Sequence, residues 1–174
     1  AITNQQNFTF PVGDAAQLRP LVLNSDGIND FAKCAYFFED PNSPSTFATS
    51  FSTGVKTEAL GPVSTIEFWR LEGNVPSTVQ LSWNERSNIN LLTEDPATIA
   101  VVGWSKATNQ WESLAGGPAM GDVTQGFVSS QSFIPDDYEV LTLASSLGEA
   151  RELISVDNFL VTPNGDGNND SLII

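Results

Sequence analysis

The sequence contains no histidine, and it has one cysteine and one methionine among its 174 residues. Without histidine, Ser-His-Asp and Cys-His catalysis, histidine general acid–base chemistry and histidine-containing zinc sites are all excluded. One cysteine excludes an internal disulfide and a four-cysteine metal site. That cysteine, Cys34, lies in an apolar segment, where we expect it to be a buried small hydrophobic residue.

Cations are also scarce. Lysine and arginine together number 7, against 21 aspartates and glutamates, which gives a net charge of −14. This excess repels phosphate backbones and anionic membrane surfaces, so we expect no nucleic-acid partner. No apolar run reaches the roughly 18–20 residues that a membrane helix needs, so we expect no membrane span.

Hydrophobic residues make up 40% of the chain, with 11 phenylalanines, which indicates a packed core. Val79, Leu81 and Trp83 alternate with polar residues, a pattern that predicts a half-buried strand. Residues 99–104 form a denser apolar run, which predicts a central strand. Turn signals such as Gly73-Asn74 recur at short spacing. The sequence therefore predicts an all-β fold, an antiparallel β-sandwich of about eight or nine strands.

Local signals set the expected boundaries within the chain. Pro20 in the apolar segment 18–23 predicts an edge strand, because proline cannot donate to a sheet ladder. Asn24 to Gly27 predicts a turn. We place the sandwich at residues 1–146 and a linker at 147–156. Residues 157–174 are then the first strand and loop of a second small β domain, and because they end in an apparent strand we expect the natural protein to continue.

A run of oxygen-bearing side chains follows at every second residue of the tail: Asn164, Asp166, Asn168 and Asp170. Calcium prefers six to eight oxygen ligands and tolerates irregular geometry, so such a flexible loop can hold this cation. The spacing is not that of an EF-hand. An Asx-rich turn that satisfies itself with side-chain-to-backbone hydrogen bonds explains the same residues. Both interpretations stay open, and Asn24–Asp30 repeats part of the pattern, either as a second loop or by chance.

The tail, Asn-Phe-Leu-Val-Thr-Pro-Asn-Gly-Asp-Gly-Asn-Asn-Asp over residues 158–170, resembles the opening of the gliding-motility-associated C-terminal domain. This is the type B sorting domain of proteins exported by the Bacteroidetes type IX secretion system. The hallmark of the family is a hydrophobic strand, then Thr-Pro-Asn-Gly-Asp-Gly, one variable residue and Asn-Asp. The residues that match it without a gap are Thr162, Pro163, Asn164, Gly165, Asp166, Gly167, Asn169 and Asp170.

A second, looser resemblance links scattered segments of residues 8–144 to the β-rich module often placed before that sorting domain. Together the two resemblances imply the non-catalytic C-terminal region of a large secreted cell-surface protein, adhesin-like or associated with gliding motility. They imply an extracellular location at the cell surface. The implied partners are the type IX translocon and its accessory outer-membrane proteins.

An alternative function is a glycan-binding β-sandwich module, with or without calcium, that is accessory to a secreted enzyme and binds surface glycans. Such a module needs an exposed aromatic ring. We expect Trp69, Trp83 and Trp104 in the core, so Trp111, beside polar neighbours after a turn, is the best candidate.

A glycoside hydrolase would instead need two converging acids. The acids of Glu94-Asp95 and Asp136-Asp137 lie in turn-like settings, where solvated loop acids are expected. The sequence also contains no catalytic serine, phosphate-loop or dinucleotide motif. We therefore expect no enzymatic activity.

Overall fold

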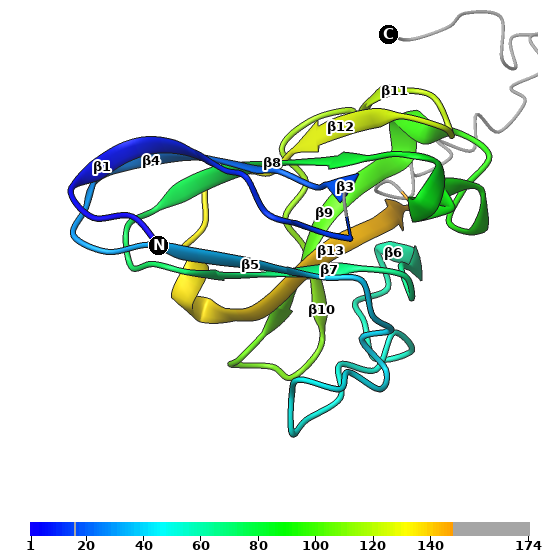
Figure 1. Cartoon of the computed structure of the whole chain (residues 1–174). Helices are drawn as coiled ribbons and strands as arrows, with labels where there is room; N and C mark the ends of the chain where they lie inside the picture. Colours follow the sequence, from blue (N-terminus) through cyan, green and yellow to red (C-terminus); the bar gives the residue numbers. More distant parts are fainter. Residues whose placement is uncertain (16, 148–174) are drawn as a thin grey trace, which may run out of the picture.

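The computed structural model describes residues 1–15 and 17–147, which form two stacked antiparallel sheets (Figure 1). The first sheet has the order β1 (Gln5–Phe10), β4 (Leu21–Asn29), β8 (Ser77–Trp83), β12 (Gly126–Ser129) and β11 (Met120–Gly121). The second has the order β10 (Trp111–Ser113), β9 (Ile99–Ser105), β13 (Tyr138–Ser146), β7 (Phe68–Glu72) and β5 (Lys33–Phe37), and β6 (Leu60–Val63) also pairs with β13. The predicted all-β antiparallel sandwich is confirmed.

Short elements complete the described part of the chain. A small hairpin joins β2 (Gly13–Asp14) to β3 (Gln17–Leu18). Four 3₁₀ turns are η1 (Glu85–Ser87), η2 (Ile89–Leu91), η3 (Pro96–Thr98) and η4 (Pro135–Asp137). Strands of two to four residues carry no readable alternation, and for this reason the sequence undercounted the strands. Across residues 1–15 and 17–147, we find no helix with the length and apolar character needed to cross a bilayer.

The main core lies between the two sheets, and the alternation of β8 places it there. Val79, Leu81 and Trp83 are buried, while Thr78, Gln80 and Ser82 between them are half-exposed. From the opposite sheet, Trp69 and Val101 pack into the same cluster. The predicted core positions of Trp69, Trp83 and Trp104 are thus confirmed, although Trp104 belongs to a second cluster.

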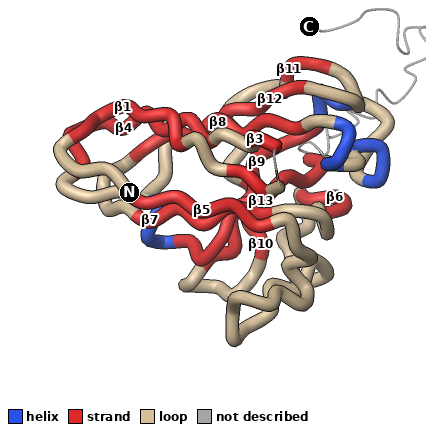
Figure 2. Tube along the Cα trace, in the orientation of Figure 1, coloured by secondary structure: helices blue, strands red, loops and turns tan. Residues whose placement is uncertain are grey.

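That second cluster covers the outer face of the second sheet. The long segment 38–59, drawn as the tan coil at the bottom of Figure 2, folds back over this face. Its Phe51 packs edge-on against Trp104 with ring centroids 5.7 Å apart, and Val102 lies in the same cluster. Since neighbouring side chains of a strand point to opposite faces, covering both faces buries every residue of β9.

Two local predictions were wrong. Strand β4 lies inside its sheet, between β1 and β8, because Pro20 precedes the strand and takes no place in its ladder. The expected turn at Asn24 to Gly27 is part of β4, where the register with β1 shifts in a bulge. There the side-chain amide of Asn29 donates to the Ser25 hydroxyl, 2.8 Å away, so the Asx-rich segment is absorbed into the sheet.

Candidate functional site

The sorting-motif residues lie outside the described residues, and so do the four tentative calcium ligands between Asn164 and Asp170. The predicted linker and domain start, 147–156 and 157–174, lie there too, apart from Leu147. Strand β13 ends at Ser146. Over residues 1–15 and 17–147, no group of three or more acidic or cysteine side chains is placed to hold a metal ion.

The prediction that Trp111 is exposed was wrong. Its side chain is completely buried, and its indole N–H donates to the Phe51 carbonyl at 3.3 Å. The backbone N–H of Trp111 also donates to the Val55 carbonyl, so the long segment 38–59 is paired along the outer edge of β10. The indole therefore has no face for a sugar, and the glycan-binding alternative loses the residue on which it depended.

The paired acids hold backbone turns. Asp136 accepts the N–H of Gly73 at 2.9 Å, which pins the β7–β8 turn to η4. Asp95 accepts the N–H of Ala97 at 3.1 Å and caps η3. A depression of about 200 Å³ gathers Asp30, Glu72 and Asp136, but Glu72 is already paired there with Arg70 at 3.0 Å. Asp136 and Asp95 therefore stabilise backbone turns.

A buried ion pair joins the two sheets. Arg19 and Glu67 are 1% and 0% exposed, and the Arg19 Nε donates to Glu67 Oε2 at 2.9 Å. The second guanidinium nitrogen donates to the other oxygen of Glu67 and to the hydroxyl of Ser87. Tyr36 donates its hydroxyl to the same carboxylate at 2.6 Å, and the Trp69 indole N–H donates to the Arg19 carbonyl at 3.0 Å. Both oxygens of the Glu67 carboxylate and two of the three guanidinium nitrogens of Arg19 are thus engaged within the core, where the pair supports the fold.

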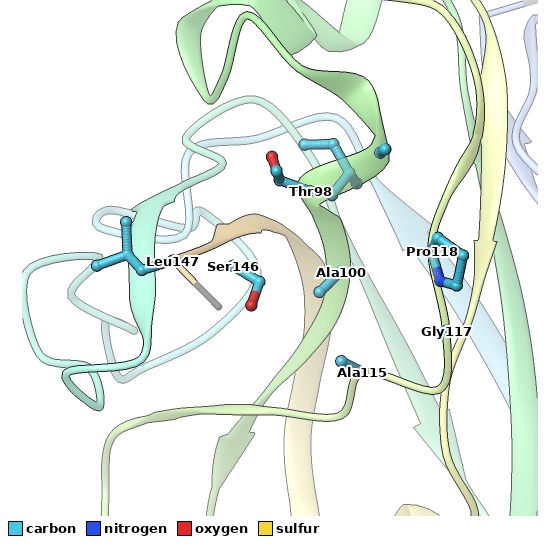
Figure 3. A pocket seen from close by; sticks show the side chains of 9 residues that line it. Thr98, Ala100, Ala115, Gly117, Pro118, Ser146 and Leu147 are labelled. Carbon is cyan, nitrogen blue, oxygen red and sulfur yellow. The ribbon is translucent and has the colours of Figure 1, made fainter. Parts of the chain in front are cut away.

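An apolar pocket of about 350 Å³ opens where β13 ends (Figure 3). Its walls are small side chains, such as Ala100 of β9 and Ala115, with Pro118 on one side and Leu147 on the other. Among residues 1–15 and 17–147, no charged residue lines it. The pocket offers mainly apolar contact area, with the hydroxyl groups of Thr98 and Ser146 as its polar side-chain groups among the described residues.

A polar pocket of about 280 Å³ lies at the loop end of the sandwich, between three segments that are far apart in sequence. It is lined by Gln17, Asn84, Glu85, Arg86, Thr124 and Gln125. The Asn84 amide donates to Gln17 Oε1 at 2.8 Å, and the Asn84 Oδ1 accepts the N–H of Arg86 at 3.0 Å. Arg86 stacks on the ring of Phe38, 3.8 Å from its centroid, and pairs with Asp14 at 3.3 Å. These contacts hold the polar side chains in place without a ligand.

The third wall of this polar pocket is fixed in the same way. The indole N–H of Trp83 donates to the carbonyl of Asp122 at 2.7 Å, which ties the β11–β12 loop to the core strand β8. The Asp122 carboxylate accepts the hydroxyl and the N–H of Thr124 and the N–H of Gln125. These hydrogen bonds, led by that of the Thr124 hydroxyl, lower the pKa of Asp122 and keep it charged.

Sequence reasoning missed the polar pocket because its three walls meet only in the folded chain. The buried ion pair did leave a signal. Arg19 stands among Leu18, Pro20 and Leu21, and Glu67 stands between Ile66 and Phe68. A single charge inside an apolar run of a cation-poor protein marks a candidate buried pair.

No protein-family model, curated protein or solved structure matches this chain.

Proposed function

We propose that this chain is a non-catalytic β-sandwich module of a large secreted cell-surface protein, exported by the type IX secretion system through its C-terminal sequence. The observation that carries this proposal is the ungapped match of residues 162–170 to the sorting-domain hallmark, directly behind a sandwich. In this role the sandwich spaces or presents a surface. The C-terminal sequence addresses the chain to the translocon and its accessory outer-membrane proteins.

The arrangement of the sandwich agrees with a structural role. Asp95 and Asp136 cap turns, Glu67 joins the buried ion pair, and the tryptophans fill the two cores. Among residues 1–15 and 17–147, no buried side-chain polar atom lacks a hydrogen-bond partner. A module of this kind needs a stable, soluble domain and an export signal. The large excess of negative charge favours solubility.

Location tests the proposal. The full-length gene product would be expressed in a type IX-competent bacterium, with and without an intact translocon. We expect the protein on the cell surface or in the medium of the competent strain, and retained inside the cell envelope of the strain without a translocon. The same location in both strains would contradict the proposal.

A matched pair of variants tests the motif itself. Asp166→Ala alters the Asn-Gly-Asp-Gly segment of the tail, and Asp26→Ala alters the similar Asn-Ser-Asp-Gly segment within β4. If residues 162–170 act as the export signal, only Asp166→Ala lowers the fraction of the protein that reaches the cell surface. Equal surface fractions in the two variants would remove residues 162–170 from the proposal.

A further inference from the structure

We propose that the polar pocket between β3, η1 and the β11–β12 loop binds a neutral carbohydrate. The proposal rests on four properties of this pocket: the kinds of polar groups that line it, their unused hydrogen-bonding capacity, its charge and its size. None of them depends on the export address, so the inference goes beyond the proposed function.

The pocket offers donors and acceptors side by side. Side-chain amides of Gln17, Asn84 and Gln125 each combine an N–H₂ donor with a carbonyl acceptor, and Glu85 adds an acceptor. A sugar hydroxyl donates one hydrogen bond and accepts others, so a ring of hydroxyls needs such a mixture. Planar amide and carboxylate groups can also engage two neighbouring hydroxyls at once, in the way that bidentate pairs form elsewhere.

Two of the groups that would meet the ligand are unengaged, and a third is only partly engaged. Among residues 1–15 and 17–147, no hydrogen bond or ion pair involves the side chains of Glu85 and Gln125, and both are exposed. Gln17 uses only its carbonyl, which accepts from Asn84. Asn84 and Arg86 are held by contacts within the protein, so binding has to order mainly Glu85 and Gln125. The part of the site that is already held loses less entropy when a ligand binds.

Charge and size restrict the class of ligand. Arg86 is already paired with Asp14, and Glu85 adds a further negative charge, so the site has no spare positive charge for an anion. Its volume of about 280 Å³ lies just below the usual range of ligand sites, roughly 300–1,000 Å³, which suits a ligand as small as one sugar ring.

An exposed leucine lies next to the polar pocket. Leu18, which is 69% exposed, lines a second depression of about 300 Å³ together with Pro11, Asp14 and Gln17, and Gln17 also lines the polar pocket. Sugar rings carry hydroxyls on their rim and C–H groups on their faces. A ring bound by the amides can therefore rest a C–H face on Leu18. This contact buries apolar area that is otherwise exposed to water.

Nuclear magnetic resonance of the ¹⁵N-labelled full chain tests the inference. The probes are the methyl glycosides of glucose, galactose, mannose and N-acetylglucosamine, each titrated to millimolar concentration, with tri-alanine as the peptide probe. We expect at least one glycoside to shift the amide signals of Gln17, Asn84 and Gln125 in a saturable way. Tri-alanine should leave them unchanged.

Variants then assign the contact. Glu85→Ala with Gln125→Ala removes two side chains that have no partner within the described chain, so the fold should be retained. Affinity should drop about tenfold or more, as the loss of two hydrogen bonds implies. Glu58→Ala with Gln131→Ala makes the same chemical changes at exposed positions outside the pocket and should bind like the parent. No glycoside-induced shift, shifts only elsewhere, unchanged affinity in the pocket variant, or stronger shifts with tri-alanine would each overturn the proposal.

Discussion

Replacing Glu67 with glutamine should lower the free energy of unfolding by about 3–5 kcal/mol, because it leaves the Arg19 guanidinium buried without a counter-charge. The two side chains are 1% and 0% exposed, so water cannot replace the lost carboxylate. Glutamine has nearly the same shape, so cavity formation contributes little. One carboxylate oxygen now accepts from both Arg19 Nε and Tyr36, at 2.9 and 2.6 Å, and an amide cannot reproduce all of these contacts.

Urea unfolding followed by tryptophan fluorescence would measure this loss. For a chain of this size, it corresponds to a fall in Tm of roughly 6–20 °C. The matched control is Glu72→Gln, whose carboxylate is 32% exposed and pairs with Arg70 at 3.0 Å on the surface. That change should cost about 1 kcal/mol or less.

The comparison of the two variants is decisive. If Glu67→Gln destabilises the protein no more than Glu72→Gln does, then the buried pair does not hold the sheets together, and the reasoning is refuted. Arg19→Met in the Glu67→Leu background would then separate the two energies, because replacing both charges can be neutral or stabilising where replacing one is not.

Three further predictions concern separate parts of the chain. Ala15→Gly should raise the stability by up to about 1 kcal/mol in urea unfolding, because Ala15 has φ 40°, a left-handed conformation that strains any residue with a Cβ; a loss of stability would contradict it. Burial raises the pKa of Cys34 from 9.0 to about 12. Burial and, to a lesser degree, the nearby charge of Glu67 raise the pKa of Tyr36 above its usual 10.0. The folded chain therefore keeps protons at these two groups that the unfolded chain loses. Stability should therefore be intact below about pH 9 and fall as the pH rises further, with a shallower fall in Cys34→Ala/Tyr36→Phe. Finally, a calcium loop in the tail predicts heat of binding on titration with millimolar calcium that Asp166→Ala abolishes, whereas no heat in the parent leaves the Asx-rich turn as the interpretation.

The fold class was predictable because the burial of a strand's two faces determines which of its successive residues are apolar and which are polar. Strand β8 has one face in the core and one in solvent, and its residues follow this order without exception. Strand β9 is buried on both faces and appears as a continuous apolar run. Each pattern depends only on neighbouring residues, so the sequence alone was sufficient.

What covers the outer face of a sheet is not a local property. Trp111 follows a turn and has polar neighbours, which favoured exposure, yet residues 38–59 cover it from a distant part of the chain. The composition of that segment, rich in serine, threonine and proline, predicted a loop but gave no sign of where it would lie. Its phenylalanines indicated that it had apolar area to bury, and of these Phe47 and Phe51 do pack against the second cluster.

The polar pocket and the buried pair were beyond reach for the same reason. Gln17, Asn84 and Gln125 become neighbours only when two hairpins and a 3₁₀ turn meet at one end of the sandwich. Arg19 and Glu67 were visible as isolated charges among apolar residues, but their pairing required the stacking of the sheets. Single sequences show which residues are unusual, whereas tertiary structure shows what they contact.

Strand β13 is the last strand of the described chain, and it lies in the middle of its sheet, with β9 on one side and β7 and β6 on the other. Without it, the six-stranded sheet separates into the β9–β10 hairpin, the β5–β7 pair and the unpaired strand β6, and two-stranded pieces are marginal in water by themselves. A ribosome releases a chain from its N-terminus to its C-terminus. The sandwich therefore cannot close until Ser146 has emerged, and the order of the strands delays its folding until that point.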